Sequence, residues 1–333
     1  MDIFIHILFL LVGFAFLIKG ADFFIVSSVS IAKKLNVSPL IIGLTLVAFG
    51  TSLPELAVSF AASISARAAG TTADIAMGNV IGSNVANLTL ILGFSAIMMP
   101  IAVRKSMHKQ EFPFLVIITI LISVLAFFFQ SDAQIVWWES LILLLFFAFY
   151  MYLMFRTKRT PSEVDEIHVV DTKKAIVLLL IGLGGVSLGG YLVTTGAEFI
   201  AIELLVSAFS MNISRATTLV GLSIVALGTS LPELVTSIMA AKKGEGEIAL
   251  GNVIGSNVFN TLLIVGLAGL VTPLGLNNDV LIDTVLLIGI TAITIFFCIT
   301  GSKISKLEGY ILLGIYFSYI LYIILRALSI LPF

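Results

Sequence analysis

Gly50-Thr51-Ser52-Leu53-Pro54-Glu55-Leu56 is a heptapeptide that recurs in the second half of the chain as Gly228-Thr229-Ser230-Leu231-Pro232-Glu233-Leu234. Both copies lie inside long apolar runs. We expect each proline to break a helix there, because proline lacks an amide hydrogen and clashes with the preceding turn. A broken helix is tolerated in lipid only where its freed carbonyls face protein or a water-filled cavity, and a carboxylate near the bilayer centre costs about 2.5–3.5 kcal/mol. Two such costly features at matching positions predict a cation site.

The composition predicts a polytopic membrane protein. Of the 333 residues, 59% are hydrophobic and 11% are charged, with a mean hydropathy of +1.16, whereas a soluble protein has about 25% charged residues. The net charge of −1 excludes a nucleic-acid binder. The single cysteine, Cys298, excludes a disulfide framework and a cysteine-based zinc site. The N-terminus lacks the basic region of a signal peptide, so we expect the first apolar segment to be retained as a span.

Ten apolar segments are each long enough to cross a bilayer of about 30 Å, which predicts an all-α integral membrane protein with ten transmembrane helices. The segments are 3–32, 38–66, 72–99, 110–130, 134–155, 174–208, 214–241, 245–271, 279–300 and 307–330. One long polar connection, from Arg156 to Lys174, separates two sets of five. We therefore expect a first five-helix repeat at 1–155, a cytoplasmic linker at 156–173 and a second repeat at 174–333.

The two halves repeat one another beyond the heptapeptide. Gly78-Asn79-Val80-Ile81-Gly82-Ser83-Asn84-Val85 recurs as Gly251-Asn252-Val253-Ile254-Gly255-Ser256-Asn257-Val258. Internal repeats of this kind are typical of secondary transporters. Because five is an odd number of spans, the second half enters the membrane from the opposite side. The sequence therefore predicts two inverted five-helix repeats.

Basic residues alternate strongly between the predicted loops. Loops after odd-numbered spans hold fourteen of them: Lys33, Lys34, Arg104, Lys105, Lys109, Arg156, Lys158, Arg159, Lys173, Lys174, Lys242, Lys243, Lys303 and Lys306. Loops after even-numbered spans hold three: Arg67, Arg215 and Arg326. Because cytoplasmic loops are enriched in lysine and arginine, we expect a multi-pass protein of the inner (plasma) membrane with both termini on the non-cytoplasmic side.

The polar residues of the broken spans are suited to a hard cation. Thr51, Ser52 and Glu55 share one helix face, and the break at Pro54 is expected to free carbonyls near Ala48. Hydroxyl, carboxylate and carbonyl oxygens are ligands for Ca²⁺ or Na⁺ rather than for soft metals. The corresponding polar stripes of the other spans are Asn79, Ser83 and Asn87; Thr229, Ser230 and Glu233; and Asn252, Ser256 and Asn260. Under inverted symmetry these sets should meet near the midplane.

Some polar residues have simpler interpretations. Asn79, Asn84, Asn252 and Asn257 are more consistent with helix-packing donors than with ligands, because amides often join membrane helices. Lys19 and Asp22, at i and i+3 in the first span, are expected to form an ion pair. No lysine or arginine lies close to Glu55 or Glu233 within the same spans, so a packing role explains those two residues poorly.

These motifs resemble the cation/calcium exchanger superfamily, in its prokaryotic sodium/calcium exchanger-like branch. Both halves carry the GTSLPE and GNVIGSNV signatures of that family's two α-repeats. The resemblance covers nearly the whole chain and implies ten helices in inverted repeats and exchange of Ca²⁺ for Na⁺, or for H⁺ in some branches. It implies a transporter rather than an enzyme, with no cofactor besides the transported ions.

The resemblance also implies roles for individual residues. Glu55 and Glu233 would be the central cation ligands. Further oxygens would come from Thr51, Ser52, Thr229 and Ser230, from the carbonyls of Ala48 and Ala226, from Ser83 and Ser256 at flanking Na⁺ sites, and from Asn87 and Asn260. Some relatives have an aspartate where this chain has Asn260. That difference leaves the number of Na⁺ ions and the use of H⁺ open.

The sequence therefore predicts a monomeric antiporter whose first and sixth spans slide across a fixed core of eight helices. The main alternative is a Ca²⁺/H⁺ exchanger that uses the same glutamates as proton carriers. A cation channel is less consistent with an inverted repeat that contains two broken helices. An intramembrane hydrolase is disfavoured because no histidine lies well inside a span.

Overall fold

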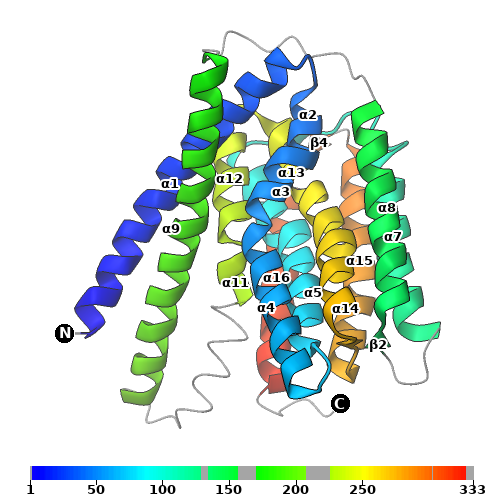
Figure 1. Cartoon of the computed structure of the whole chain (residues 1–333). Helices are drawn as coiled ribbons and strands as arrows, with labels where there is room; N and C mark the ends of the chain where they lie inside the picture. Colours follow the sequence, from blue (N-terminus) through cyan, green and yellow to red (C-terminus); the bar gives the residue numbers. More distant parts are fainter. Residues whose placement is uncertain (1, 129–133, 157–169, 208–225, 302, 328–333) are drawn as a thin grey trace.

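The computed structural model describes residues 2–128, 134–156, 170–207, 226–301 and 303–327, and these are mostly helical (Figure 1). The elements of the first half are α1 (Asp2–Lys34), α2 (Pro39–Ile42), the π-helix η1 (Gly43–Val47), α3 (Ala48–Thr51), α4 (Leu53–Ala69), α5 (Asp74–Ala86), the π-helix η2 (Asn87–Ile91), α6 (Leu92–Met98), β1 (Ile101–Ala102), α7 (Glu111–Phe128), β2 (Gln134–Ile135) and α8 (Trp137–Arg156). Those of the second half are α9 (Thr172–Ser207), α11 (Ala226–Thr229), α12 (Leu231–Lys242), α13 (Gly246–Val258), the π-helix η4 (Phe259–Ile264), α14 (Val265–Val271), β3 (Leu274–Gly275), α15 (Asn278–Thr300), β4 (Lys303–Ile304) and α16 (Lys306–Ala327).

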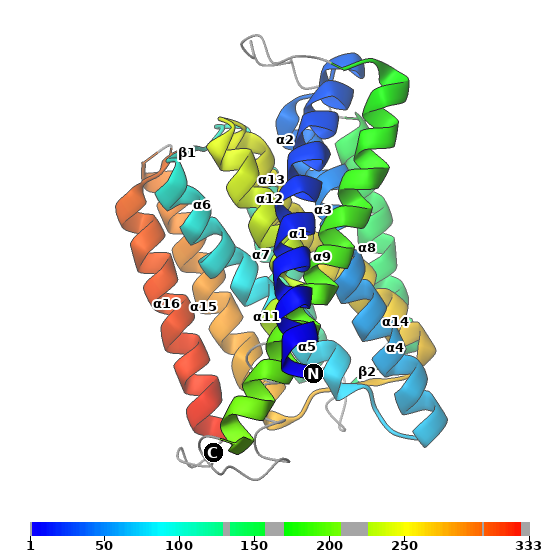
Figure 2. The ribbon, with the colours of Figure 1, turned by 90° about the vertical axis from the view of Figure 1, so that its left-hand side faces the viewer.

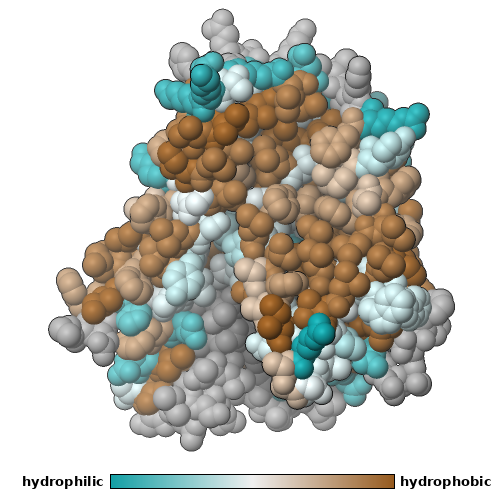
Figure 3. All heavy atoms as spheres, viewed as in Figure 1, coloured by the Kyte–Doolittle hydropathy of each residue, from teal (hydrophilic) through white to brown (hydrophobic). Residues whose placement is uncertain are grey.

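The long apolar helices identify a multi-pass membrane protein. Within the described residues, seven helices are long and apolar enough to cross a bilayer. The number is eight if the bent pair Pro39–Thr51 and Leu53–Ala69 counts as one span. The apolar helix α7 is shorter, and residues 208–225, which include the start of the expected span 214–241, lie outside the description. Ten spans therefore remain a prediction. Apolar side chains cover most of the lateral surface in Figure 3, with hydrophilic ones gathered toward its ends.

The most buried helices are those that carry the GNVIGSNV motifs. In each of the continuous segments Asp74–Met98 and Gly246–Val271, 83% of the most apolar window is buried, against 17% for α1 and 28% for α9. These two segments therefore form the centre of the bundle. Glycine lets α13 approach the broken span closely, because a Cβ at Gly251 would lie 2.7 Å from the Leu40 carbonyl oxygen.

Helices α1 and α9 form a separate long pair on the outside of the bundle (Figures 1 and 2). Their backbones are in contact, since a Cβ at Gly20 would lie 2.7 Å from the Val186 nitrogen and one at Gly182 would lie 2.6 Å from the Phe24 nitrogen. Small residues permit this approach between membrane helices. The ion pair expected between Lys19 and Asp22 is not the one that forms. Asp22 pairs instead with Lys243 at 2.6 Å, which ties α1 to the C-terminal end of α12.

Two short antiparallel strand pairs join the halves at opposite ends of the bundle. β1 pairs with β4 at one end and β2 pairs with β3 at the other (Figures 1 and 2). The end with β1 and β4 also holds the C-terminus of α1 and the loop between α12 and α13, which carry Lys33, Lys34, Lys242 and Lys243; we call it the basic end. The N-terminal end of α1 and the C-terminal end of α16 lie at the opposite end.

Candidate cation site

Both heptapeptides break their helices, as the prolines predict. Pro54 is the second residue of α4, and Ser52 just before that helix has φ −81° and ψ 7°, outside the helical range. The axis bends by 46° at this point. Pro232 has the same place in α12, and Ser230 has φ −87° and ψ 4°. Each glutamate therefore lies in the first turn of a helix, next to a break.

The two breaks are cross-linked by hydrogen bonds between the halves. The Ser52 hydroxyl donates to Glu233 Oε1 at 3.0 Å, and the Ser230 hydroxyl donates to Glu55 Oε1 at 3.2 Å. Both carboxyl groups are buried, with residues 1% exposed. Within the described residues neither forms an ion pair with a lysine or arginine. Folding thus places two carboxyl groups in one buried region, where the described part of the chain gives them no basic partner.

A second reciprocal pair of contacts joins threonine to asparagine. The Thr51 hydroxyl lies 3.1 Å from Asn252 Oδ1, and the Thr229 hydroxyl lies 3.5 Å from Asn79 Oδ1. The amide of Asn79 also donates to the Glu55 carbonyl oxygen at 3.3 Å, so it fixes the backbone that carries the glutamate. The threonines and asparagines of the two halves therefore pack around the same centre.

Three of the four asparagines expected to be packing donors donate a hydrogen bond to a neighbouring helix. Asn79 and Asn252 donate to Ser59 and Ser237 of neighbouring helices, each at 2.9 Å. Asn84 likewise donates to Thr261 of the other half at 2.9 Å. The amide of Asn257 donates instead to the Val253 carbonyl of its own helix at 2.9 Å, so its packing role stays a prediction.

The buried polar atoms that lack a hydrogen-bond partner among the described residues include atoms of six residues expected at the cation site. They are Glu55 Oε2, Glu233 Oε2, Ser83 Oγ, Ser256 Oγ, and both amide atoms of Asn87 and of Asn260. A buried polar atom without a partner costs about 1–3 kcal/mol, and such atoms are few in folded proteins. Most of these atoms are hard oxygens, which suit a Ca²⁺ or Na⁺ substrate.

Among the described residues three π-helical turns flank this region, and sequence reasoning predicted none of them. η2 begins at Asn87, η4 contains Asn260, and η1 ends immediately before Ala48. Single π-helical turns are frequent at functional sites. Nothing in the local sequence indicates them, because Gly43–Val47 reads as an ordinary apolar run.

Carbonyl ligands are expected from Ala48 and Ala226, and the surroundings of Ala48 are the more fully described of the two. The Ala48 carbonyl accepts the Ser52 amide hydrogen at 3.0 Å, and the Thr51 hydroxyl lies 3.4 Å from the same oxygen. Ala226 is the first residue of α11, and residues 208–225 before it lie outside the description. A ligand role for either carbonyl stays a prediction.

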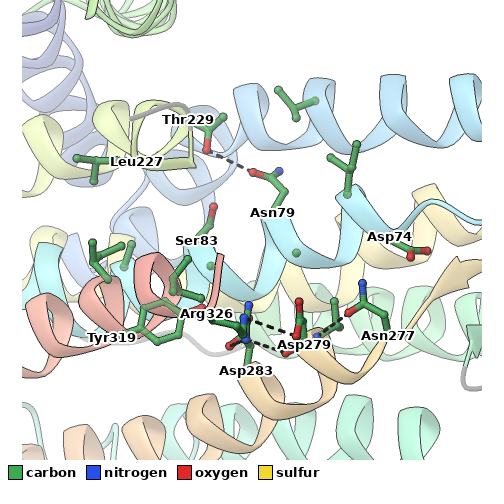
Figure 4. A pocket seen from close by; sticks show the side chains of 18 of the residues that line it. Asp74, Asn79, Ser83, Leu227, Thr229, Asn277, Asp279, Asp283, Tyr319 and Arg326 are labelled. Carbon is green, nitrogen blue, oxygen red and sulfur yellow. Dashed lines mark hydrogen bonds and ion pairs between the residues drawn. The ribbon is translucent and has the colours of Figure 1, made fainter. Parts of the chain in front are cut away.

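A cavity of about 390 Å³ reaches this region from the end opposite the basic end. Asn79, Ser83 and Thr229 line its inner part, next to Glu55 (Figure 4). Asn277 and Asp279 line its outer part and are exposed. The cavity therefore joins exposed residues at this end to polar residues beside the candidate site.

Comparison with known proteins agrees with this geometry. The family model described as sodium/calcium exchanger protein matches residues 5–156 and 174–325, which is most of the chain. The chain belongs to the sodium/calcium exchanger protein family. Two similar proteins are named as an antiporter and as an exchanger. Membership of this family therefore fits the expectation of a transporter rather than an enzyme.

Members of the exchanger family from bacteria and archaea are similar over most of their length. The chain is 38% identical to the putative antiporter CaxA of Alkalimonas amylolytica, over 80% of this chain and 81% of that one. It is 35% identical to the sodium/calcium exchanger MaX1 of Methanosarcina acetivorans, over 95% and 97%. A solved structure of the sodium-calcium exchanger NCX_Mj, soaked without Na⁺ and Ca²⁺, superposes with a TM-score of 0.80 at 31% identity and covers 96% of this chain and 99% of that one.

Proposed function

We propose that the chain is a secondary antiporter that exchanges Ca²⁺ for Na⁺ by alternating access, with Glu55 and Glu233 as central cation ligands. The observation that carries the proposal is the reciprocal pair of bonds from Ser52 to Glu233 and from Ser230 to Glu55. These bonds gather two buried carboxyl groups, each with its second oxygen unpartnered among the described residues. A divalent cation, or several monovalent ones, would supply the missing partner.

The same proposal assigns the other oxygen ligands. Thr51, Ser52, Thr229 and Ser230 surround the glutamates, and Asn87 and Asn260 complete the central set with their amide oxygens. Ser83 and Ser256 would flank it as Na⁺ sites, and the carbonyls of Ala48 and Ala226 would contribute from the broken helices. The family to which the chain belongs and the name of MaX1 support Ca²⁺ and Na⁺ as substrates.

The coupling of Ca²⁺ transport to Na⁺ transport follows from electrostatics. An unloaded site carries two bare carboxylates, and moving such charge through a region of low dielectric is strongly unfavourable. A loaded site is neutralised and can switch between its two facing states. The pair α1 and α9 is our candidate for the element that slides. Little of either helix is buried, and their close backbone contacts lie mainly within the pair.

The proposed architecture is ten spans in two inverted repeats, 1–155 and 174–333, joined by a cytoplasmic linker at 156–173. The strand pairs support inversion, because β1 follows α6 at the basic end whereas β3 follows the matching helix α14 at the opposite end. The two segments matched by the family model coincide with the two halves. The basic end is proposed to face the cytoplasm of a plasma membrane, with the protein as a monomer.

A Ca²⁺/H⁺ exchanger is the second candidate, and Asn260 is the residue that favours it. With asparagine there, the central set holds two carboxyl groups, and a proton on either one would relieve their mutual repulsion as a cation does. Isotopic Ca²⁺ uptake into vesicles that contain the purified protein separates the two. Uptake driven by an imposed Na⁺ gradient is the expected result, whereas uptake driven only by a pH gradient would assign H⁺ as the counter-ion.

A further inference from the structure

An ion pair that the proposed exchange does not use lines the cavity of about 390 Å³ described above. We call this cavity the access cavity. Arg326 of α16 binds Asp283 of α15 through two parallel contacts, Nη1 to Oδ1 at 3.0 Å and Nη2 to Oδ2 at 3.1 Å (Figure 4). The arginine and aspartate side chains are 14% and 12% exposed. The bidentate geometry occupies both oxygens of Asp283, so this carboxylate is not free to bind a passing cation.

Two further groups hold Arg326 in place. Asp279 Oδ1 lies 3.6 Å from Arg326 Nε, and the aspartate side chain is 55% exposed toward the outer part of the cavity. The guanidinium also donates to the Tyr322 hydroxyl at 3.1 Å and lies 5.1 Å from the centre of that ring. Asp74 is the remaining carboxylate of the lining, and the Thr72 hydroxyl donates to it at 2.6 Å. The described lining thus contains three aspartates and one arginine.

A buried ion pair adds little net stability, because the desolvation of two charges offsets most of their attraction. Its position is more informative than its energy. The same cavity is lined by Asn79 and Thr229, which contact each other beside Glu55. Charges on the wall of a narrow cleft change the local concentration of ions and their rates of association. Without Arg326, two carboxylates would face a divalent ion, which is a typical oxygen environment for Ca²⁺.

We propose that Arg326 is the counter-charge that prevents Asp279 and Asp283 from retaining the cation in the access cavity. Together these three residues set how strongly this face of the exchanger loads Ca²⁺ relative to Na⁺. The inference rests on the proposed exchange function. It adds a specificity device on the route to the site, outside the residues that hold the transported ion.

The charge of the ion makes the effect recognisable. An electrostatic change acts on Ca²⁺ with twice the energy that it has for Na⁺, so the factor for Ca²⁺ is the square of the factor for each Na⁺. For one unit charge about 10 Å from the ion in a water-like dielectric, these factors are about fourfold and about twofold. A purely structural defect would have no reason to follow this relation.

The experiment measures half-saturating Ca²⁺ and Na⁺ for exchange in proteoliposomes, with the ion added to each face in turn. Asp279→Asn removes a half-exposed negative charge without emptying the core. It should raise half-saturating Ca²⁺ about fourfold and half-saturating Na⁺ about twofold, on the cavity face only. Arg326→Gln should lower both values and reduce the maximal rate, because the ion then dwells in the cavity. Equilibrium titration of Arg326→Gln with Ca²⁺ should reveal an additional weak binding step.

Two further variants separate charge from structure. Arg326→Lys retains the charge and loses the bidentate geometry, so it should stay within about twofold of the wild type. The double variant Asp283→Asn with Arg326→Gln restores the charge balance of the lining and should also stay near the wild type. Raising ionic strength with an inert organic chloride should shrink the shifts of the single variants, because salt screens exposed charges.

Arg156→Gln is the matched control. Arg156 donates to Tyr152 four residues earlier, as Arg326 does to Tyr322, but it ends α8 and does not line the cavity. This variant should leave both ions unaffected. Absence of exchange by the wild type would overturn the proposed function itself. If the wild type exchanges, then unchanged half-saturation in Asp279→Asn and Arg326→Gln, or equal factors for both ions, would overturn only the role proposed for the charges that line the cavity.

Discussion

At the scale of single residues, the candidate site is marked by buried polar atoms that lack a hydrogen-bond partner among the described residues. Glu55 and Glu233 each receive one serine hydroxyl from the other half, which satisfies one carboxyl oxygen and leaves the second without a partner in the described chain. A buried oxygen without a partner costs free energy, and this cost is the physical reason to expect a bound cation there. It also makes the two glutamates the most direct test of the assignment.

We predict that Glu55→Gln and Glu233→Gln each abolish Na⁺-driven Ca²⁺ uptake while the protein still inserts and folds. Loss of one charged partner in a buried pair costs about 3–5 kcal/mol, which corresponds to a loss of Ca²⁺ affinity of at least about 100-fold. Isotopic flux and gel filtration in detergent measure the two properties. Glu139→Gln is the control, since Glu139 is equally buried but lies at the start of α8. A near-normal rate in either site variant would remove that glutamate from the ligand set.

Asn260 offers a second test at this scale. Asn260→Asp adds a third carboxylate, and attraction between opposite unit charges about 4 Å apart is about 4 kcal/mol at an effective dielectric of about 20, of which desolvation of the new group cancels part. We expect tighter Ca²⁺ binding, with a larger gain for Ca²⁺ than for Na⁺, and slower turnover because the extra charge opposes switching. Half-saturating Ca²⁺ and maximal rate at neutral and raised pH measure both. Unchanged values at both pH values would place Asn260 outside the first coordination shell.

At the scale of helices, glycine decides which elements can touch. A Cβ at Gly182 of α9 would lie 2.6 Å from the Phe24 nitrogen of α1, whereas none of the described atoms lies within 4 Å of a Cβ at Gly184, two residues along the same helix. The first position therefore determines the spacing of the α1–α9 pair. The second provides a control of the same residue type on the same helix.

We predict that Gly182→Ala forces the pair apart and destabilises the protein by about 1–3 kcal/mol, as overpacking does, while Gly184→Ala is close to neutral. Because α1 and α9 are the proposed moving pair, Gly182→Ala should also lower the maximal exchange rate more than it changes half-saturating Ca²⁺. Thermal unfolding in detergent and flux measurements test the two parts. Equal behaviour of both variants would argue that the close backbone contact is not required.

At the scale of the whole molecule, the two ends differ in charge. The loops at the basic end carry most of the described lysines, while the N-terminal end of α1 and the C-terminal end of α16 lie at the opposite end. A reporter fused after Phe333 should therefore be outside the cytoplasm, and one inserted between Arg156 and Lys174 should be inside. Enzymatic reporters that are active on one side only provide the measurement. Detection of both reporters on the same side would contradict ten spans and the inverted repeat with them.

The sequence alone determined the class, the family and the broken helices. Composition excludes a soluble protein, and the paired GTSLPE and GNVIGSNV motifs point to the exchanger family that the comparison establishes. The breaks at Pro54 and Pro232 follow from the chemistry of proline alone, which acts on its own helix. The same local reasoning singled out the glutamates, although their role as ligands is still a prediction.

Only the tertiary structure decided which residues contact one another across the two halves. The bonds from Ser52 to Glu233 and from Ser230 to Glu55 join helices far apart in the chain, so no local pattern encodes them. For the same reason Asp22 pairs with Lys243 rather than with the nearby Lys19, and the pairing of Arg326 with Asp283 in the cavity could not be predicted. The π-helical turns next to Asn87 and within the segment of Asn260 also escaped prediction. Spacing along the chain specifies the face of one helix, whereas the packing of helices against one another determines which faces meet.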